Sequence, residues 1–409
     1  GCYNIMFDIN KLRQDFPILK NNNLVYLDNA STTQKPNIVI KTINDFYKNF
    51  NANVHRGNYD IAEKATAKYE NTRKETAKLL NCSFNEIIFT KGTTESINLV
   101  ASSLADSLLM PGDEVIISEM EHHSNIIPWQ LLADKKKINL KYIPISKKGT
   151  LQIEELSRLI TKKTKLISIT HMSNLLGIIN PIEDIISIAK NNNILTLIDA
   201  AQSISHLDID VQNLDCDFLV FSGHKFLGPT GVGILYGKYD LLEKMPPFLG
   251  GGHMIKEVSM EKSTWGNPPF KFEAGTPNIA PVIGLGEAIK YYNKIHNKEL
   301  YQYLNTLTNY MIGKLITIPN IQIYPLVKYH DKRKGPIIAF KIKDVHPFDL
   351  AKLLGTKGIC IRAGHHCTQP ILKKFNVTSL NRVSLYYYNT KEEIDLFYKS
   401  ILDIVKILI

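Results

Sequence analysis

The stretch Asp217-Phe-Leu-Val-Phe-Ser-Gly-His-Lys-Phe-Leu-Gly-Pro229 decides how the rest of the chain is interpreted. Its apolar run 218–221 predicts a short buried strand, and Ser222-Gly223 predicts a turn directly after it. Such a turn presents His224 and Lys225 at the carboxyl end of the strand. A lysine placed there can form a Schiff base with a carbonyl cofactor, since partial desolvation lowers its pKa and frees the amine. Taken alone, however, the stretch favours the simpler interpretation of a surface lysine at a strand end.

The composition and charge of the chain narrow the kinds of protein it can be. At 409 residues it exceeds the size of one hydrophobic core, so we expect two domains. Hydrophobic residues make up 44% and charged residues 22%, which is typical of a soluble protein. No apolar run reaches the roughly 20 residues of a spanning helix, so we expect no membrane partner. The net charge is +10, but the lysines are scattered without a nucleic-acid-binding motif, which favours a solvated basic surface and no nucleic-acid partner.

The cysteines argue against a disulfide-stabilised protein. They are Cys2, Cys82, Cys216, Cys360 and Cys367. Their number is odd, they lie far apart, and no two form a C-x-x-C pair, which also argues against a cysteine-rich zinc site. This pattern predicts a reducing compartment.

Short apolar strands alternate with helices through the first part of the chain. The expected strands are 86–90, 115–118, 140–144, 166–170, 194–198, 218–221 and 232–236, with helices at 92–109, 153–160 and 182–190. Nearly continuous apolar strands in such an alternation predict an α/β fold, in which helices cover both faces of a mostly parallel sheet.

The pattern changes near Gly275. A long helix over 282–310 is expected to leave the first domain, and strands at 337–342 and 359–361 then mix with helices at 348–354 and 392–408. This mixture predicts a smaller α+β domain. We therefore expect an N-terminal segment at 1–23, a large domain at 24–280 and a small C-terminal domain at 281–409.

Polar residues follow several predicted strands, at the sheet edge where ligands bind in open α/β folds. Gly92-Thr93-Thr94-Glu95 stands between a strand and a helix, and its hydroxyls, backbone N–H groups and helix dipole suit a phosphate. The same stretch equally fits an ordinary helix cap with an acidic first turn. The sequence alone favours neither interpretation.

Two further strand ends carry an acidic residue and a pair of histidines. Asp199 follows the 194–198 run, and its carboxylate can pair with a protonated pyridine nitrogen. A ribose ligand of the Rossmann type is the alternative, but no G-x-G-x-x-G precedes it. Gln202 can donate to a ring oxygen. His123 can stack on a flat cofactor or move protons, whereas His122 can cap or pack.

Together these residues closely resemble the fold-type-I pyridoxal-phosphate enzymes over nearly the whole chain. Within that group the chain resembles the cysteine desulfurases of the class V aminotransferases, and its last motif resembles the SufS type (group II). The motifs that carry the resemblance are Gly92-Thr-Thr-Glu95, Glu121-His-His123, Asp199-Ala-Ala-Gln202, Ser222-Gly-His-Lys225, Gly275-Thr-Pro-Asn278 and Arg362-Ala-Gly-His-His-Cys367.

The resemblance implies a pyridoxal 5'-phosphate cofactor and assigns residues to it. Lys225 would carry the cofactor and His123 would stack on its ring. Asp199 and Gln202 would hold the ring nitrogen and the phenolic oxygen. The implied phosphate ligands are Thr93, Thr94, Ser222, His224 and, from the second subunit of a homodimer, Thr276.

The same resemblance implies L-cysteine as the substrate. Arg382 would grip its carboxylate, a task that suits a bidentate guanidinium. The other residues implied for the substrate site are Asn174, Arg362 and His55.

Cys367 is the expected nucleophile. It follows His365 and His366 on a loop after the 359–361 strand, where nearby His and Arg residues favour a thiolate. A zinc site of His365, His366 and Cys367 is the alternative, but three consecutive residues cannot easily face one tetrahedral ion, so we expect no metal. Thr368 departs from the SufS pattern, which usually has alanine at this position.

By this resemblance the protein converts L-cysteine to L-alanine. Lys225 removes the α-proton, the Cys367 thiolate takes the sulfur as a persulfide, and His123 assists proton transfer. The short loop around Cys367 resembles that of the SufS type, which implies a SufE-type sulfur acceptor and the SUF scaffold complex of iron–sulfur cluster assembly. Selenocysteine lyase activity, another fold-type-I lyase or aminotransferase, and an inactive scaffold are the alternatives.

The compartment is inferred from composition. The chain is rich in Asn, Lys and Ile, which indicates an AT-rich genome, and it opens with Gly1 in place of Met. We therefore expect a plastid protein, specifically apicoplast-like, that has lost a transit peptide. The bacterial cytoplasm is the alternative, because the SufS type occurs in both.

Overall fold

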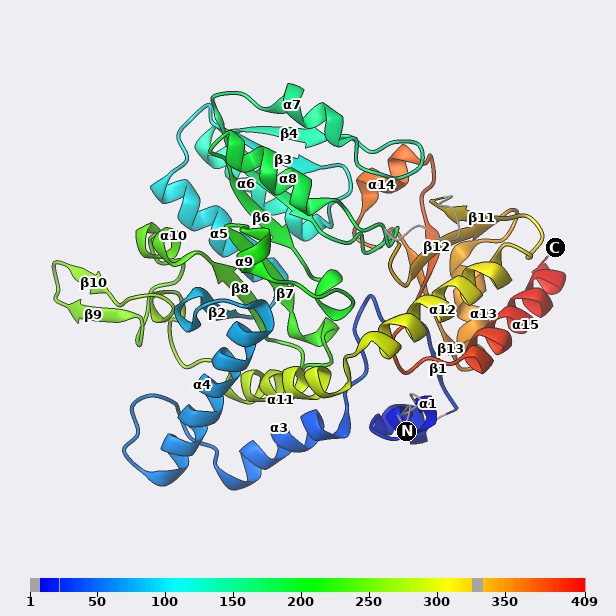
Figure 1. The fold of residues 1–409 in the computed structure, drawn as a ribbon, viewed down its shortest axis with the longest axis horizontal. Coiled ribbons are helices and arrows are strands. Elements are labelled where there is room, and N and C mark those ends of the chain that lie inside the picture. Colours follow the sequence, from blue (N-terminus) through cyan, green and yellow to red (C-terminus); the bar gives the residue numbers. More distant parts are fainter. Residues whose placement is uncertain (1–7, 22, 326–333, 409) are drawn as a thin grey trace, which may run out of the picture.

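The computed structural model describes residues 8–21, 23–325 and 334–408, so Cys2 lies outside the described residues. Within them, a seven-stranded sheet has the order β2-β8-β7-β6-β5-β3-β4 (Figure 1). Its strands are β2 (Ile87–Thr90), β3 (Glu114–Ser118), β4 (Asn139–Ile143), β5 (Thr164–Thr170), β6 (Leu195–Asp199), β7 (Phe218–Ser222) and β8 (Gly233–Gly237). β8 is antiparallel to both neighbours, and the other pairs are parallel. The predicted mostly parallel α/β sheet is confirmed.

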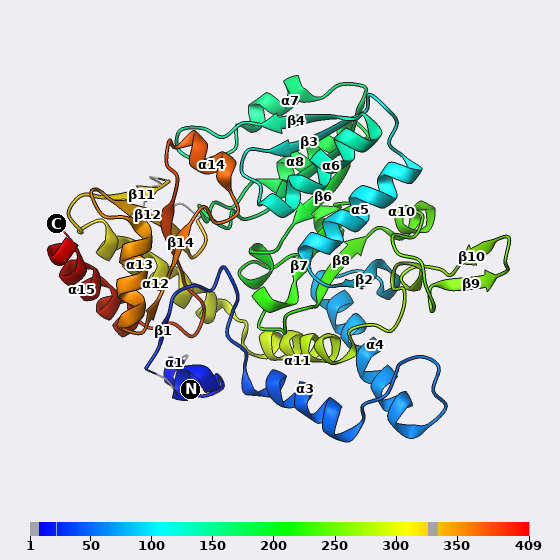
Figure 2. The same ribbon diagram turned by 180° about the vertical axis from the view of Figure 1, so that it is seen from behind.

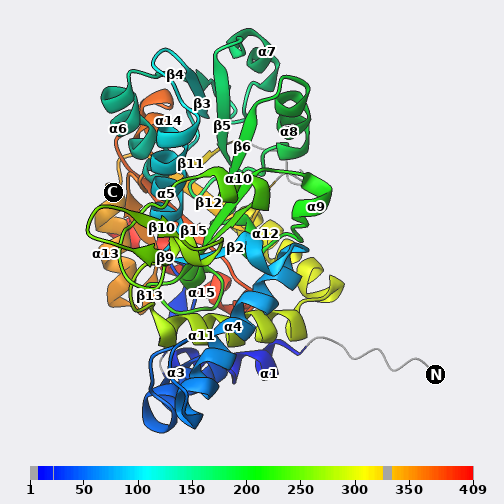
Figure 3. The ribbon, with the colours of Figure 1, turned by 90° about the vertical axis from the view of Figure 1, so that its left-hand side faces the viewer.

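Both faces of this sheet are buried, because successive side chains of a strand point to opposite faces. In β7, Phe218 and Val220 pack into one hydrophobic cluster, whereas Leu219 and Phe221 pack into another. Figure 3 shows the two helix layers edge-on. One layer holds α5 (Thr93–Ser107) and α6 (Ile127–Lys136), and the other holds α8 (Ile182–Asn191) and α9 (Val211–Leu214).

The C-terminal part contains a second, antiparallel sheet of the order β11-β12-β15-β14. Its strands are β11 (Ile321–Tyr324), β12 (Ile337–Ile342), β14 (Arg362–Gly364) and β15 (Leu380–Ser384). The helices of this part are α12 (Lys298–Leu315), α13 (Pro347–Thr356), α14 (Gln369–Lys374) and α15 (Lys391–Leu408). This architecture confirms the predicted smaller α+β unit.

The long helix predicted over 282–310 is in fact two helices, α11 (Ile279–Ile295) and α12. Asn297 interrupts the helix because its side chain accepts a hydrogen bond from Leu300 N at 2.8 Å and so caps α12. The preceding residue, His296, has an extended backbone. The chain therefore changes direction where it passes from one sheet to the other (Figure 1).

The residues from Val25 to Asn29 are attached to the C-terminal part. β1 (Val25–Tyr26) pairs in parallel with β13 (Ile359–Cys360), and Asp28 forms a bridge to Ser384. Asn29 Nδ2 also donates to Ser384 O at 2.8 Å. The domain limits expected from the sequence stay a prediction, but the residues just after position 23 make these contacts with the C-terminal part.

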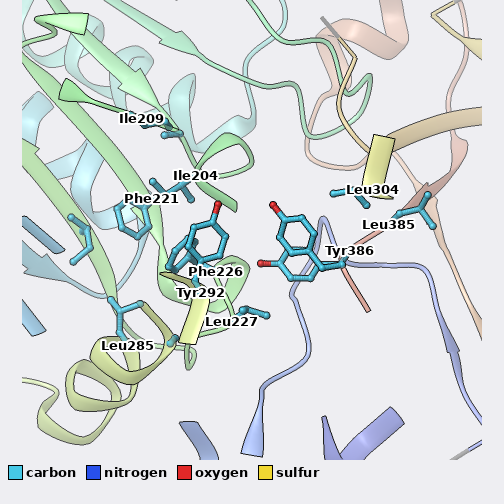
Figure 4. Packing of buried hydrophobic residues seen from close by; sticks show 14 of the residues in the cluster. Ile204, Ile209, Phe221, Phe226, Leu227, Leu285, Tyr292, Leu304, Leu385 and Tyr386 are labelled. Carbon is cyan, nitrogen blue, oxygen red and sulfur yellow. The ribbon is translucent and has the colours of Figure 1, made fainter. Parts of the chain in front are cut away.

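One hydrophobic cluster runs through both parts of the molecule. Figure 4 shows Phe226 and Tyr292 from the first part, and Leu304 and Tyr386 from the second, in this cluster. The ring centroids of Phe226 and Tyr292 lie 4.6 Å apart. Because these side chains are buried, separating the two parts would expose their shared core to water.

The other elements lie around these sheets. They are α1 (Ile9–Arg13), α2 (Pro17–Asn21), α3 (Asn37–Asn49), α4 (Asp60–Leu80), α7 (Leu156–Leu159), α10 (Tyr239–Lys244), β9 (Ile255–Val258) and β10 (Ser263–Trp265). The β9–β10 hairpin extends away from the body, as seen from the front and from behind (Figure 1, Figure 2). Among the described helices, none has the length and apolar character needed to cross a bilayer.

A fully buried ion pair holds α4 at the edge of the large sheet. Nη1 and Nη2 of Arg73 lie 2.7 and 2.9 Å from the two carboxylate oxygens of Glu273. Nη1 also donates to Ile87 O, the first residue of β2, at 2.7 Å. Removing Arg73 would leave the charge of Glu273 buried and uncompensated, whereas Arg73 itself is also paired with Glu70, whose Oε2 lies 2.9 Å from Nε.

We predict that Arg73→Ala lowers the free energy of unfolding by about 3 to 5 kcal/mol, the usual cost of breaking a buried pair. Urea unfolding followed by tryptophan fluorescence measures this change. The matched control is Arg158→Ala, which breaks an exposed pair with Glu155 and should cost less than about 1 kcal/mol. Equal losses in the two variants would contradict the role given to Arg73.

Candidate active site

A cavity of about 420 Å³ lies at the carboxyl ends of β5, β6 and β7. Ala30 and Ser31, which follow β1, and the loop between β14 and α14 complete its wall. The predicted site residues that line it are Thr93, Thr94, Asn174, Asp199, Gln202, Ser222, His224, Lys225, Arg362, Cys367 and Arg382. The predicted residues outside this lining are His55, His123 and Thr276.

Lys225 reaches the cavity from a turn of three residues, Gly223–Lys225, directly after β7. The carbonyl oxygen of His224 accepts hydrogen bonds from Thr33 N at 3.0 Å and from Lys35 Nζ at 2.7 Å, which fixes this turn. Burial lowers the pKa of Lys225 to about 8, although the nearby Asp199 acts in the opposite direction. The amine is therefore partly neutral at physiological pH.

Asp199 is buried at the end of β6, next to Lys225. Its Oδ1 accepts a hydrogen bond from Ala201 N at 2.9 Å. Burial raises its pKa, and the Ala201 N–H and the charge of Lys225 oppose this effect. Gln202 follows on the same turn and donates from Nε2 to Ala30 O at 2.8 Å, which leaves its second amide hydrogen available.

Hydroxyl groups gather where α5 begins. Thr93 N donates to Ser222 Oγ at 2.9 Å, and Thr93 Oγ1 lies 2.8 Å from the same atom. Gly233 is required behind them, because a Cβ at that position would lie 2.4 Å from Gly92 Cα. Backbone N–H groups of a helix N-terminus together with these hydroxyls form a site for an anion such as a phosphate.

The two consecutive histidines face different surroundings. His122 lines the cavity, and its Nδ1 accepts a hydrogen bond from Ser124 N at 3.0 Å, so the neutral ring carries its proton on Nε2. Burial, with a smaller contribution from Lys225, lowers the pKa of His122 to about 3. The sequence analysis assigned His122 a capping or packing role. The cap is present, and the cavity position was not predicted.

His123 points instead toward the loop that carries Cys367. Its backbone N donates to Cys367 O at 2.8 Å, and its Nε2 accepts from Gln369 N at 3.3 Å. The ring stacks on that of His365 with centroids 5.7 Å apart. The backbone at His122 is extended, which turns neighbouring side chains to opposite sides. The structure therefore places His122, and not His123, where a flat ligand in the cavity would be contacted.

The loop around Cys367 is short and held at several points. His366 and Cys367 both have positive φ, 53° and 56°, a left-handed conformation that is uncommon for such residues. Cys367 N donates to His365 Nδ1 at 3.0 Å, and Asn174 Nδ2 donates to His366 O at 2.8 Å. The hydroxyl of Thr368 donates to His365 O at 3.0 Å. The unusual threonine therefore closes the loop with a hydrogen bond that alanine cannot make.

Two arginines, Arg362 and Arg382, line the cavity on the side of the C-terminal sheet. Arg382 is almost fully buried, and it donates to Asn174 O at 2.8 Å, to Asp28 Oδ1 at 3.0 Å and to Ser31 Oγ at 2.9 Å. Arg362 Nη1 also contacts Ser31 Oγ. Two guanidinium groups that meet at one hydroxyl create a positive wall that suits a carboxylate.

His55 and Thr276 lie apart from this cavity in the single chain. His55 Nε2 lies 2.6 Å from Glu70 Oε1, and its ring stacks on His253 with centroids 4.6 Å apart. Thr276 is exposed and accepts a hydrogen bond from Asn53 Nδ2 at 3.4 Å. Their predicted roles stay predictions. In the described part of the chain, no group of three or more His, Cys, Asp or Glu side chains could hold a metal ion.

The aminotransferase class-V family matches residues 25–397. The chain belongs to this family. It is 46% identical over 394 residues to a probable cysteine desulfurase of Staphylococcus epidermidis, a match that covers 95% of each chain. These findings confirm the resemblance to the class V cysteine desulfurases. Because this relative and its Staphylococcus aureus counterpart are bacterial, the expectation of a plastid finds no support.

Similar solved structures confirm the fold. The cysteine desulfurase CsdA of Escherichia coli, in its S-sulfonic acid form, is 37% identical and has a TM-score of 0.92, with 98% of this chain and 100% of that chain covered. A mutant of C-DES with glycine covalently linked to its pyridoxal-phosphate cofactor has a TM-score of 0.83, with 96% and 99% covered. At 22% identity the second likeness shows the fold alone.

We predict that Lys225 reacts with acetic anhydride at unusually low pH. With a pKa of about 8, its neutral fraction rises from about one tenth at pH 7 to about nine tenths at pH 9. Its labelling should level off there, whereas that of typical surface lysines keeps rising toward about pH 10.4. Peptide mass spectrometry of the cofactor-free chain measures both. Labelling of Lys225 that follows the surface lysines would contradict the proposed effect of burial.

Proposed function

We propose that this protein is a cysteine desulfurase, which takes sulfur from L-cysteine as a persulfide on Cys367 and releases L-alanine. The observation that carries the proposal is the shared cavity. Lys225 follows β7 of the large sheet and Cys367 follows β14 of the C-terminal sheet. Both line one cavity, together with a buried carboxyl group and two guanidinium groups. The cysteine desulfurases among its relatives support the same conclusion.

The residues around the cavity fit pyridoxal 5'-phosphate. Lys225 would hold its aldehyde carbon, Asp199 its pyridine nitrogen and Gln202 its phenolic oxygen. His122, which faces the cavity as a neutral ring, would lie against the cofactor in the role that the family resemblance implied for His123. The residues that would hold the phosphate are Thr93, Thr94, Ser222 and His224. When bound, the cofactor supplies an electron sink for the negative charge that develops at the substrate α-carbon.

The side chains of this chain then have distinct tasks. Arg382 and Arg362 orient the substrate carboxylate. Lys225, because its pKa is near 8, is neutral often enough to accept the α-proton. The Cys367 thiolate forms a sulfur–sulfur bond while the carbon–sulfur bond of the substrate breaks. The bonding electrons stay with carbon, which takes up a proton to become the methyl group of alanine. His123, which contacts the Cys367 loop, is the proposed proton carrier.

We predict that the wild-type protein with pyridoxal phosphate forms alanine from L-cysteine, and that a single sulfur atom is added to Cys367. Chromatographic alanine assays and intact-mass spectrometry before and after reduction measure these two results. Lys225→Ala and Cys367→Ser should each lose at least about 100-fold in kcat, the scale at which reacting groups contribute. Cys216→Ser is the matched control, because that thiol is buried outside the cavity. Full turnover by Cys367→Ser would contradict the proposed nucleophile.

The acceptor of the sulfur is proposed to be a SufE-type protein that works with the SUF scaffold complex. The short Cys367 loop supports this, because its neighbours tie it down and α14 begins only two residues later. A persulfide held in this way cannot travel far, so the acceptor must reach into the cavity. The SufS type is proposed on the same basis. The bacterial relatives favour the bacterial cytoplasm as the compartment.

A homodimer is proposed to complete each site with Thr276 of the second subunit. We predict that Thr276→Ala weakens cofactor binding, and that mixed dimers of Thr276→Ala with Lys225→Ala chains regain activity. Each mixed dimer would contain one site with an intact lysine and an intact threonine. Refolding the two variants together, with each variant alone as the control, tests this by alanine release. No recovery in dimers shown to be mixed would place the effect of Thr276 within its own chain.

A further inference from the structure

A second carboxyl group lies behind the cavity wall. Glu121 has no exposed surface and directly precedes His122 in the turn after β3. Its Oε1 lies 2.5 Å from Ser118 Oγ and accepts from Thr170 N at 3.1 Å. Its Oε2 accepts from Asn125 Nδ2 at 2.7 Å. This side chain therefore ties the end of β3 to the end of β5 and to the short helix η2 (His123–Asn125).

The hydrogen bonds continue away from the cavity. Asn125 Oδ1 accepts from Trp129 Nε1 of α6 at 2.9 Å and from Ser168 Oγ of β5 at 2.6 Å. These residues have at most 1% of their surface exposed. Because no water can replace the bonds that are lost, any shift of Glu121 would leave buried polar atoms without partners. The turn that carries His122 is thus held from behind by one carboxyl group.

Asp199 is the charged group that faces Glu121. The groups that hydrogen-bond Glu121 from β3, β5 and η2 are neutral, namely Ser118, Thr170 and Asn125. Asp199 stands on β6 directly beside Thr170. Burial raises the pKa of Glu121 to about 8, and the charge of Asp199 adds to this effect. Two buried carboxyl groups this close do not both carry a charge without a large cost.

Asp199 and Glu121 differ in the neighbouring groups that offset the effect of burial on their pKa values. Asp199 has the cationic Lys225 beside it and an N–H donor from Ala201. Glu121 has neutral donors and no cation among the groups that shift it. As an acid it can donate to Ser118 Oγ, whose oxygen also accepts from Met120 N at 3.1 Å. The proton of the pair therefore belongs on Glu121 and the negative charge on Asp199.

We propose that Glu121 is a positioning residue: it stays a neutral acid, leaves the negative charge to Asp199, and holds the turn that carries His122. The consequence for catalysis rests on the proposed function, because the charge of Asp199 acts only on a bound pyridine ring. The protonation state of Glu121 is a property of the chain itself and can be measured with or without cofactor.

Infrared spectroscopy of the full chain, prepared with ¹³C-labelled glutamate, tests this proposal. At pH 7 we expect the carbonyl band of a protonated, isotope-shifted glutamic acid, and this band should disappear as the pH rises through about 8. It should be absent in Glu121→Gln. The matched control is Glu119→Gln, which alters a partly exposed carboxylate of the same turn that bonds Lys374 and Ile145 N. That variant should keep the band.

Thermal unfolding of the cofactor-free chain gives a second readout. A buried acid whose pKa is raised from 4.5 to about 8 stabilises the fold below pH 4.5, and this stability is lost as the pH rises toward 8. The unfolding temperature of Glu121→Gln should therefore fall less steeply over this range than that of the wild type or Glu119→Gln. A constant offset from an imperfect amide fit would not change this slope.

Protein with bound pyridoxal phosphate tests whether the ionisation of Glu121 affects the cofactor. The visible absorption band of the wild type should shift as Glu121 ionises near pH 8, and Glu121→Gln should remove that transition. If no protonated glutamic acid is found at pH 7, or if its band persists in Glu121→Gln, the proposal is overturned even where alanine is formed. If the band behaves as expected but cysteine yields no alanine, the neutral acid stands and the desulfurase function fails.

Discussion

The parallel pairing of β5, β6 and β7 is the constraint on which the site depends. Thr170 pairs with Asp199, and Asp199 pairs with Val220, so the three strands end at the same edge of the sheet. This register alone brings the carboxyl group of Asp199 beside the turn that carries Lys225. Burial at this edge disfavours the charged form of each group, so it raises the pKa of Asp199 and lowers the pKa of Lys225. The attraction between the charges of Asp199 and Lys225 limits both of these pKa shifts.

Residues 31–35 connect the Lys225 side of the cavity to its arginine side. Thr33 and Lys35 hold the His224 carbonyl, and Ser31 receives the guanidinium of Arg382. A few consecutive residues therefore contact both the lysine turn and the arginine wall. The residues that precede them pair with the C-terminal part, β1 with β13 and Asp28 with Ser384 of β15. Backbone pairing and these side-chain hydrogen bonds therefore together set the distance between Lys225 and the two arginines.

Hydrophobic runs predicted the strands of the large sheet, and polar residues at their ends predicted part of the cavity lining. The spacing and type of the residues along the chain are enough to make these predictions. Asn174, Arg362 and Arg382 were implied only by the family resemblance. The choice between His122 and His123 could not be made, since two adjacent histidines on an extended turn differ only in which side they face. The break between α11 and α12 was not predicted, because the helical pattern spans it and only the side-chain cap at Asn297 marks it. Glu121 was not recognised as a site residue because a single acid beside two histidines gives no sign of burial.

The attachment of residues 25–29 to Ser384 and to β13 has a consequence for how the protein is made. A ribosome delivers these residues well before β13 and β15, the strands that receive them. Arg13 likewise waits for Glu393, with which it pairs at 2.9 Å. During synthesis the first β-strand therefore has an unsatisfied edge for most of the elongation time, which is a state prone to aggregation. The cavity wall is complete only after Cys367 and Arg382 have been made, so a chain that stops before them cannot assemble the cavity.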